Sequence, residues 1–284
     1  MRILVLGATG HIGAAVVERL LAAGETPVAV TRDGEKAAAL TERGAEAAVL
    51  DLTDVDALRA AMRGVQRAFL LNPPADPAGD MDADERASVR AMLAALDGSG
   101  LEGIVAVSTY GATAQEGLGD LSTLYGLEQG LAAQPIPAAV VRAAYLISNW
   151  DAMLEPAKGG TLPAMFPADF VMPMVAPADV GAAAARLLMQ AAPATRTVSV
   201  EGPERSTPAA VAAAFGAALG REVTVATVPP EGFEAAYRKH GFSEMAAASF
   251  ARMTRAALVG DWPEDVERGP TGLDEYVRAL VGRG

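Results

Sequence analysis

Short apolar runs alternate with longer amphipathic segments through the first half of the chain. The runs, which read as buried strands, cover residues 3–6, 27–31, 47–50, 67–71, 103–108 and 138–142. Helical patterns cover 14–23, 35–43, 54–62, 84–96 and 121–133. Strands that alternate with helices in this way pair in parallel through helical crossovers. The pattern therefore predicts an α/β fold built on a doubly wound parallel sheet.

The alternation of strand and helix patterns ends after Arg142. Residues 143–175 contain four prolines and no regular pattern, so we expect irregular structure there. Beyond them, helices are predicted for 177–190, 207–219, 231–240, 243–259 and 271–280, and strands for 197–200 and 222–228. The second half is therefore predicted to form a smaller, mostly helical lobe.

Three glycines, Gly7, Gly10 and Gly13, lie where the first apolar run meets the first helix. Gly7 permits a sharp turn, Gly10 lets a pyrophosphate approach the backbone, and Gly13 lets the helix pack on the strand. The helix N-terminus then offers free N–H groups to the phosphates. A glycine-rich turn without a ligand is the alternative. Three more candidate cofactor residues share this loop: Thr9, His11 and Ile12.

This motif divides the chain by expected role. We predict that residues 1–150 form an NAD(P)-binding Rossmann domain, to which a segment near 177–200 returns. Residues 151–284 are predicted to form the smaller substrate-binding lobe. No linker of biased composition separates the two parts, so we expect them to pack against each other.

The end of the second predicted strand selects between the two nicotinamide cofactors. An acidic residue there binds the ribose 2′-hydroxyl of NAD, whereas a basic residue pairs with the 2′-phosphate of NADP. Here the position is Arg32, whose planar fork suits a phosphate, and Lys36 follows one turn into the next helix. Asp33 is the alternative, as a ribose-binding acid. We favour NADP(H) over NAD(H).

Composition and charge narrow the classes of partner and function that the chain can have. The net charge of −12 argues against nucleic acid or an anionic membrane as a partner, and no apolar run is long enough to span a bilayer. The chain has no cysteine and two histidines, so we expect no metal centre. These features are typical of a cytoplasmic protein that acts on a small molecule; a homo-oligomer is compatible with them.

With these elements placed, the chain resembles the NmrA-like family, an atypical branch of the short-chain dehydrogenase/reductase superfamily. The resemblance rests first on residues 7–13 and on Arg32 with Lys36 downstream. Further stretches that carry it are 71–74, 107–111, 127–129, 136–145 with Asn149, and 201–203. Together these stretches extend over most of the chain to about residue 220.

The resemblance implies further cofactor contacts. An acid at Asp51 would contact the adenine amino group, and Leu52 would pack on the ring. A turn or helix-capping role for Asp51 is equally compatible with the sequence. The ends of the fourth and fifth strands add five candidate cofactor residues: Asn72, Pro73, Pro74, Ser108 and Thr109.

The usual catalytic pair of the superfamily is a tyrosine and a lysine four residues later, which tunes the phenol for acid–base work. Here Tyr125 is followed by Gln129, and the only lysines are Lys36, Lys158 and Lys239. Two hypotheses follow: an NADPH-dependent oxidoreductase that transfers hydride to a small conjugated carbonyl or quinone-like acceptor without this pair, or a non-catalytic NADP(H)-binding sensor or regulatory module. The candidate catalytic residues are Tyr110, Tyr125 and Tyr145.

An enzyme of this kind needs an apolar pocket beside the nicotinamide. The main substrate-lining candidates are Tyr110, Tyr145, Asn149, Trp150, Phe166 and Phe233. Further candidates for this lining are Phe170, Met172 and Met253. The alternative is that most of these side chains are ordinary core between the two lobes. Arg142 is a candidate for burial against a carboxylate under either hypothesis.

Overall fold

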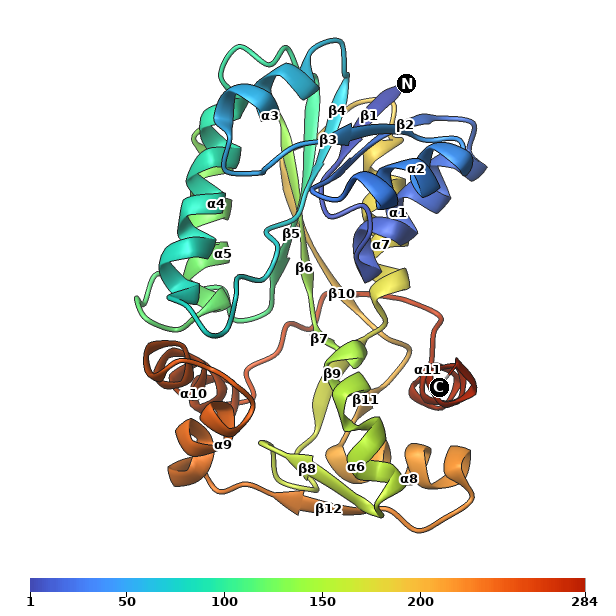
Figure 1. The fold of residues 1–284 in the computed structure, drawn as a ribbon, viewed down its shortest axis with the longest axis vertical. Helices are drawn as coiled ribbons and strands as arrows, with labels where there is room; N and C mark the ends of the chain where they lie inside the picture. The colour runs from blue at the N-terminus through green and yellow to red at the C-terminus, as the bar shows by residue number, and fades with distance from the viewer. Residues whose placement is uncertain (284) are drawn as a thin grey trace.

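The computed structural model describes residues 1–283. Its central strands are β1 (Arg2–Val5), β2 (Thr26–Thr31), β3 (Glu46–Val49), β4 (Arg67–Leu70), β5 (Gly103–Thr109), β6 (Ala138–Ala143), β10 (Arg196–Glu201) and β13 (Glu267–Arg268). They form one sheet in the order β13-β10-β6-β5-β4-β1-β2-β3. Every neighbouring pair is parallel, so all the strands end at the same edge of the sheet (Figure 1).

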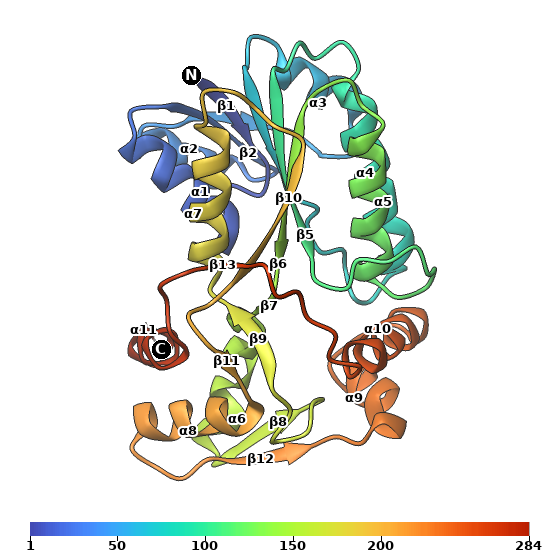
Figure 2. The ribbon, with the colours of Figure 1, turned by 180° about the vertical axis from the view of Figure 1, so that it is seen from behind.

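Six helices cover the two faces of this sheet: α1 (His11–Ala22), α2 (Gly34–Glu42), α3 (Val55–Met62), α4 (Met81–Leu96), α5 (Asp120–Ala132) and α7 (Pro177–Leu188). Helices α1, α2 and α7 lie on one face and α3, α4 and α5 on the other (Figures 1 and 2). Successive side chains of β1 point to opposite faces of the sheet, which explains why helices cover both faces. Ile3 and Val5 enter the core on the α1 side, and Leu4 enters the core on the opposite side.

Helices α1 and α7 pack unusually closely because α7 carries a glycine at the contact. A Cβ atom at Gly181 would lie 2.8 Å from the carbonyl oxygen of Ile12 and 2.7 Å from the Cβ of Ala15. Only the absence of a side chain at residue 181 permits this approach. The contact holds α7 against the first turns of α1, so the second half of the chain is anchored beside the glycine loop.

Below the carboxyl edge of the sheet lies a second group of elements. Its strands are β7 (Tyr145–Leu146), β8 (Thr161–Ala164), β9 (Met172–Val175), β11 (Arg205–Ser206) and β12 (Thr224–Thr227), which form the small sheets β11-β9-β7 and β12-β8. Its helices are η1 (Ile147–Met153), α6 (Leu154–Lys158), α8 (Pro208–Leu219), η2 (Pro230–Gly232), α9 (Phe233–Lys239), α10 (Glu244–Ala257) and α11 (Leu273–Arg283). A separate apolar core, which includes Phe215, Trp150 and Phe166, stabilises this group.

The predicted parallel sheet is confirmed, and so are several helix ends. Asp54 accepts a hydrogen bond from the Ala57 N–H at the start of α3, and Thr207 does the same for Ala210 at the start of α8. Gly220 ends α8 with a φ of 65°. These ends were predictable because each signal acts within one helical turn.

Other predictions were wrong. Residues 143–175 are not irregular but contain β7, η1, α6, β8 and β9. Helix α4 begins at Met81 behind an Asp80 cap, three residues before the predicted start. Strands β11 and β13 were not predicted at all. Each is two residues long, and such short strands are defined by the neighbour they pair with and not by a local pattern.

Candidate functional site

The loop after β1 has the geometry predicted for a phosphate-binding turn. Gly7 has a φ of 64°, a left-handed conformation that favours glycine, and a Cβ there would lie 2.7 Å from the Leu71 side chain. A Cβ at Gly13 would lie 2.1 Å from the carbonyl oxygen of Gly7. Above Gly10 the space is open, since only the Gly7 oxygen comes within 4 Å of its Cβ position, at 3.4 Å. The backbone at residue 10 is therefore accessible to a ligand.

The N-terminus of α1 suits an anion. Its N-cap residue is Gly10, so no side chain accepts a hydrogen bond from the first N–H groups, and the first turn holds no acidic residue. These N–H groups have no partner within the helix and carry the positive end of its dipole. His11 begins the helix with an exposed side chain, whereas Ile12 is buried in the core and Thr9 is exposed beside the turn. A phosphate group meets the requirements of this turn.

At the end of β2 the structure separates the roles of Arg32 and Asp33. The Asp33 carboxylate caps α2, because it accepts hydrogen bonds from the backbone N–H groups of Glu35 at 2.9 Å and Lys36 at 3.3 Å. Arg32 is exposed and has no ion pair within the described residues. Lys36 is also exposed, with its Nζ 3.9 Å from Asp33. The two cations are therefore free to face an anion, while the acid serves the helix.

Asp51 ends β3 beside Arg32. Its carboxylate accepts hydrogen bonds from the Thr53 N–H at 2.8 Å and the Thr53 hydroxyl at 2.7 Å. These bonds lower the pKa of Asp51, and the Arg32 charge adds to the effect. Leu52 is half-buried and packs on the core of the α3 and α4 face. Asp51 therefore has a turn-forming role, and one of its carboxylate oxygens is not used by Thr53.

The segment after β4 contains an unpaired polar atom. The Oδ1 atom of Asn72 is buried and has no hydrogen-bond partner among residues 1–283. Pro73 is half-buried and Pro74 is exposed. A buried acceptor without a donor costs free energy, so Asn72 meets the expectation for a residue that is completed by a ligand.

Ser108 and Thr109 end β5 on opposite faces of the sheet. Ser108 is 2% exposed and donates a hydrogen bond of 2.6 Å to Glu128 on α5. Glu128 also binds Arg142 of β6 through two hydrogen bonds, of 2.8 and 2.6 Å. The expected contact of Arg142 with a carboxylate is therefore present, but the Arg142 side chain is 33% exposed and not buried. This network uses the Ser108 hydroxyl, whereas Thr109 is half-buried on the α1 face, away from Glu128.

Tyr110 belongs to a second buried network. Its hydroxyl lies 3.5 Å from Oε1 of Glu201, a carboxylate with no exposed surface. Arg205 donates two hydrogen bonds to Glu201, of 2.9 and 3.2 Å, and Arg268 lies 3.3 Å from it. Burial raises the pKa of Tyr110, and the charge of Glu201 raises it further. The phenol therefore faces a carboxylate that belongs to the fold.

The other two candidate tyrosines differ in their surroundings. Tyr125 lies on α5 near the Arg142 guanidinium, on the side of the Glu128 network. Tyr145 lies below the carboxyl edge, with its ring 5.9 Å from Trp150 and 5.7 Å from Phe166. Burial raises the pKa of the Tyr145 phenol, the phenol of Tyr237 adds to the effect, and a hydrogen bond from Asn149 opposes it. At neutral pH Tyr145 therefore keeps its proton.

The remaining pocket candidates do not all share one surface. Asn149 is exposed, whereas Trp150 is 4% exposed and its ring N–H is buried without a partner among the described residues. Phe166 is buried and stacks on Phe170 at 5.5 Å. Phe233 has no exposed surface, and the Arg255 guanidinium covers its ring. The two methionine candidates also differ in exposure: Met172 is buried, and Met253 is half-buried on α10.

One buried cluster near this edge was missed by the sequence analysis. Glu85 of α4 is 2% exposed and lies against Asp120, the first residue of α5. Burial and the Asp120 carboxyl raise the pKa of Glu85 to about 8, and burial also raises that of Asp120. We therefore expect the two groups to share a proton at neutral pH. No local pattern marks such a pair, because its members are brought together only by the packing of α4 on α5.

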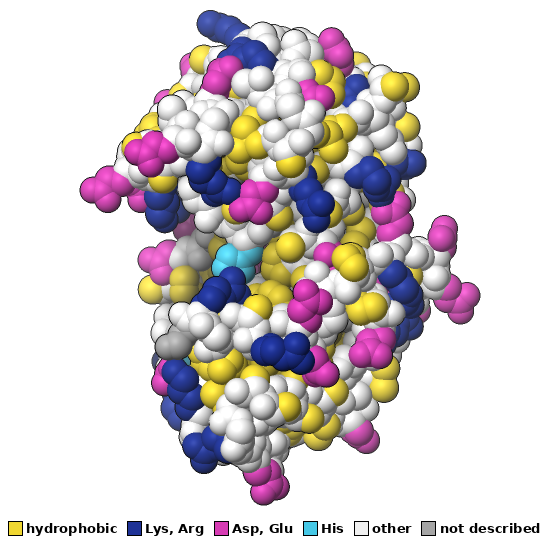
Figure 3. Space-filling model, turned by 90° about the vertical axis from the view of Figure 1, so that its right-hand side faces the viewer, with side chains coloured by type: hydrophobic (Ala, Val, Ile, Leu, Met, Phe, Trp, Pro, Cys, Tyr) yellow, Lys and Arg dark blue, Asp and Glu magenta, His cyan; other side chains and the backbone are white. Residues whose placement is uncertain are grey.

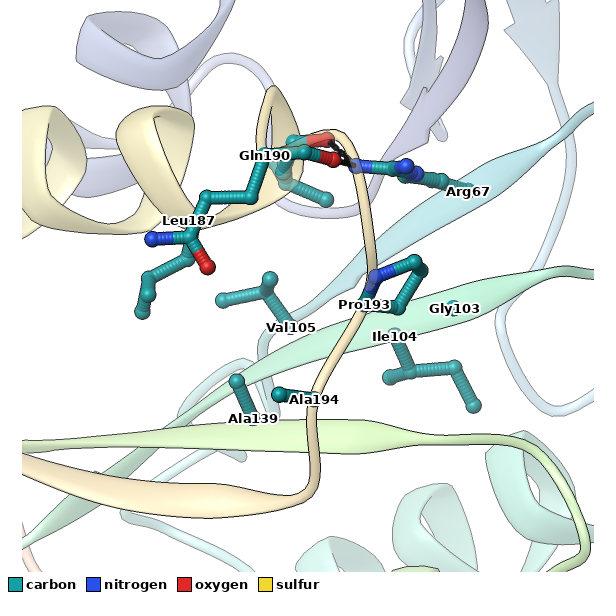
Figure 4. A pocket seen from close by; sticks show the side chains of 10 residues that line it. Arg67, Gly103, Ile104, Val105, Ala139, Leu187, Gln190, Pro193 and Ala194 are labelled. Carbon is teal, nitrogen blue, oxygen red and sulfur yellow. Dashed lines mark hydrogen bonds between the residues drawn. The ribbon is translucent and has the colours of Figure 1, made fainter.

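Figure 3 shows the surface hollowed between the half that carries the sheet and the half below it, with hydrophobic side chains in the hollow. A different cavity, of about 10 Å³, lies at the opposite edge of the sheet. Figure 4 shows Arg67 beside it, and its guanidinium donates to the backbone oxygens of Leu188 and Gln190 at the end of α7. This cavity holds at most one water molecule, so we assign it no binding role.

No helix among residues 1–283 is long and apolar enough to cross a membrane, and no group of three or more His, Cys, Asp or Glu side chains in that range is placed to hold a metal ion. The buried carboxylates of Glu128 and Glu201 instead pair with arginine side chains.

Known proteins resemble this chain over almost its whole length. The profile of the NmrA-like family matches residues 1–277. An NAD(P)H azoreductase from Xenophilus azovorans is 28% identical over 257 residues, which cover 86% of this chain and 83% of that protein. An NADPH-dependent quinone oxidoreductase from Escherichia coli, solved with NADPH, is 26% identical with a TM-score of 0.80, and 99% of each chain is covered. The Citrobacter sp. triphenylmethane reductase, solved with NADP(H), shares the fold at 21% identity, with a TM-score of 0.81 over 98% of this chain and 99% of that one.

Proposed function

We propose that this chain, which belongs to the NmrA-like family, is an NADPH-dependent oxidoreductase that reduces a small conjugated acceptor such as a quinone or an azo compound. The relatives named for azo and quinone reduction support this proposal. The observation that carries it is the loop of Gly7, Gly10 and Gly13: Gly7 has a left-handed φ, a Cβ at Gly13 would collide with the Gly7 backbone, and the space at Gly10 is open. Such a loop at an uncapped helix N-terminus fits a dinucleotide phosphate.

The residues around this loop fit NADP(H) better than NAD(H). Asp33, the acid that would bind a ribose 2′-hydroxyl, is engaged as the cap of α2 through its Oδ1 atom, while its Oδ2 atom takes no helix N–H. Arg32 and Lys36 are exposed beside it, and a guanidinium pairs with a 2′-phosphate through two parallel hydrogen bonds. Asn72 offers its buried oxygen to the cofactor, and the free oxygen of Asp51 is available to an adenine amino group.

The bound cofactor supplies the hydride. Reduction of a quinone or azo acceptor also consumes one proton, which must reach an oxygen or nitrogen of the acceptor. Of the three candidate tyrosines, Tyr145 fits this task best, because Tyr110 faces the Glu201 carboxylate and Tyr125 lies on the Arg142 side of α5. The Tyr145 phenol keeps its proton at neutral pH, so it donates a hydrogen bond to the acceptor heteroatom, and water restores any proton that it loses.

We assign acceptor binding to the group of elements below the carboxyl edge of the sheet, which includes Tyr145 of β7. Aromatic rings on this side form a series from Trp150 through Tyr145 and Phe166 to Phe170. Trp150 and Phe166 are buried in the core of this lobe, so the half-buried Tyr145 and Phe170 offer the ring surface that a ligand can reach. Conjugated, planar acceptors bind well against such rings because offset stacking and edge contacts both favour them. The aromatic series therefore supports a conjugated acceptor over a sugar or an amino acid.

Calorimetric titration with NADPH and NADH, followed by mixing of the NADPH complex with a panel of quinones and azo dyes, tests this proposal. Oxidation of NADPH that is lost in Tyr145→Phe, with unchanged NADPH affinity, supports the reductase. Tight NADPH binding without oxidation by any acceptor in the panel supports the sensor instead. Failure to bind either nucleotide refutes both functions.

A further inference from the structure

Residues 258–266 join α10 to β13 and cross the molecule between its two halves (Figures 1 and 2). Trp262 in this segment is half-buried. Its side chain packs against the apolar core on the α1 side of the sheet and also against the apolar core of the elements below the sheet. Trp262 therefore lies at the junction of the two halves, a position that no motif in the sequence indicated.

A polar network fixes this segment at the carboxyl edge of the sheet. Arg205 donates one hydrogen bond to the Pro263 carbonyl oxygen at 2.8 Å and another to the Glu201 carboxylate at 2.9 Å. Glu201 has no exposed surface and lies 3.5 Å from the Tyr110 hydroxyl, directly after the end of β5. Ligands of such parallel sheets bind outside the carboxyl ends of the strands. Trp262, the neighbour of Pro263, therefore lies beside the edge where an acceptor meets the cofactor.

Trp262 also contacts the aromatic series of the proposed acceptor site. Its ring lies 6.5 Å from the ring of Phe170, at an interplanar angle of 75°. Gly260 has a φ of 72°, and a Cβ there would lie 3.7 Å from the Phe170 ring and 3.9 Å from Nε1 of Trp262. The left-handed turn at Gly260, which favours glycine, thus directs the indole toward Phe170. Both rings are half-buried, so they offer neighbouring surfaces that a ligand can reach.

Exposed apolar side chains flank this contact. The large hydrophobic side chains that are exposed among residues 1–283 are Met1, Val49, Val171, Met245 and Val259. Val171 is 57% exposed and directly follows Phe170, whereas Val259 is 81% exposed and directly precedes Gly260. Two of these five exposed side chains therefore lie beside the pair of Phe170 and Trp262. Apolar surface that is left open beside two aromatic rings is typical of a site for an apolar ligand.

We propose that Trp262 is a specificity-determining residue of the acceptor site, whose indole ring packs against the second ring of an acceptor with two or more aromatic rings. This inference rests on the proposed reductase function. Successive ring contacts of 5.7, 5.5 and 6.5 Å lead from Tyr145 through Phe166 and Phe170 to Trp262. A one-ring quinone at Tyr145 spans only part of this series, whereas a fused-ring quinone or a diaryl azo compound reaches further along it. Trp262 therefore favours multi-ring acceptors.

A comparison of acceptors of different size tests the role of Trp262. Trp262→Leu removes the indole and keeps an apolar side chain. We expect it to lower kcat/KM for naphthoquinone and for a diaryl azo dye by about three- to ten-fold, the effect of one lost aromatic contact, and to lower kcat/KM for benzoquinone by less than about two-fold. The affinity for NADPH should not change. Trp262→Phe restores a smaller ring and should recover part of the loss. Met245→Ala removes another exposed apolar side chain, on α10, and is the control that should change neither value.

Fluorescence tests the same contact without turnover, because the chain contains only two tryptophans. Trp150→Phe leaves Trp262 as the single tryptophan, and Trp262→Phe leaves the buried Trp150. Naphthoquinone, added to the complex with NADP⁺, should quench the emission of Trp262 saturably and more strongly than that of Trp150, because quinones quench indoles at short range. This titration keeps Trp262 in place, so it decides the question even if Trp262→Leu fails to fold.

Two results would each overturn the inference. One is an equal loss of kcat/KM for one-ring and two-ring acceptors in Trp262→Leu. The other is quenching of Trp262 that rises in proportion to the quinone without saturating, as it does for a tryptophan that meets the quinone only by collision. Absence of turnover in the unmodified protein refutes the reductase, and the fluorescence titration then still decides whether Trp262 binds an aromatic ligand.

Discussion

The shared proton between Glu85 and Asp120 predicts how the stability of this protein depends on pH. Glu85 is 2% exposed, and its main neighbours are the Asp120 and Asp82 carboxyls and the Ala75 backbone N–H, 3.3 Å from Oε1. The cation that approaches this group, Arg86, lies 4.0 Å from Asp82 and is about half exposed. Deprotonation of the pair therefore places two negative charges in a buried site with little compensation.

The magnitude follows from the pKa of Glu85, which rises from 4.5 to about 8 on folding. A group whose folded pKa is raised contributes stability that is complete below pH 4.5 and is lost as the pH rises to about 8. If Glu85 carried the whole effect, the loss would be roughly 5 kcal/mol. Because Asp120 shares the proton and the site can relax, we expect about 2–3 kcal/mol.

Glu85→Gln tests this reasoning, because glutamine mimics the protonated acid and donates its amide to Asp120. Unfolding by urea is followed from pH 5 to pH 9, with Glu42→Gln, an exposed change on α2, as the control. We expect Glu85→Gln to match the unmodified protein near pH 5 and to exceed its stability by about 2–3 kcal/mol near pH 9. Parallel stability curves for the two proteins across this range would refute the argument.

Three further predictions concern the cofactor site and the network below it. Arg32→Ala should weaken NADPH binding by about ten- to a hundred-fold, the effect of a lost charge-assisted pair, and leave NADH binding nearly unchanged in calorimetry; equal losses for both nucleotides would contradict the assigned role. Gly13→Ala places a Cβ 2.1 Å from the Gly7 oxygen, so we expect it to lower the free energy of unfolding in urea by about 1–3 kcal/mol and also to weaken NADPH binding. Gly34→Ala is the control, because nothing lies within 4 Å of the Cβ that it adds. Glu128→Ala leaves Ser108 and Arg142 without their partner and should lower the free energy of unfolding by about 2–3 kcal/mol. This loss is below the range for fully buried pairs because the Arg142 side chain is 33% exposed. A loss under about 0.5 kcal/mol would show that the pair adds nothing to the stability of the fold.

The features that could be predicted from the sequence are those set by neighbouring residues. The glycine loop is one, because its strand, turn and helix follow each other within residues 3–13. The parallel order of the sheet is another, since helical crossovers between apolar runs leave few other arrangements. The capping role of Asp33 could also be predicted from the sequence, because an aspartate directly before a helix is a common N-cap. The structure shows the cap, because both N–H groups bind Oδ1 of this carboxylate; the role of Asp33 toward a ribose stays a prediction.

The features that could not be predicted depend on residues far apart in the chain. Glu201 binds Arg268 across the return of the C-terminal segment, and Asp179 accepts two hydrogen bonds from Thr271. Neither partner is marked by a motif. The aromatic series likewise joins Tyr145 to Phe166 across β8, which the four prolines of that region concealed. Proline at such positions was compatible with short strands because they lie outside the central sheet, where fewer ladder bonds are required.

The placement of the buried charges explains why these distant pairs matter for function. The buried carboxylates among residues 1–283 are Glu85, Glu128, Asp179 and Glu201. All four lie toward the carboxyl edge of the sheet, and each joins two elements there: α4 and α5, α5 and β6, α7 and the segment before α11, and β10 and β13.

The opposite edge holds the buried arginine, Arg67, which binds only backbone oxygens at the end of α7. Apolar packing would hold the segments at the carboxyl edge equally well, but it does not fix direction or register as hydrogen-bonded carboxylates do. A site assembled from several loops needs that fixed geometry, since the positions of Asn72 and Tyr145 relative to each other decide whether one ligand can meet both. We therefore expect substitutions that disrupt these pairs to impair acceptor reduction before they unfold the protein, whereas substitutions at Arg67 should lower stability without changing the selectivity among acceptors.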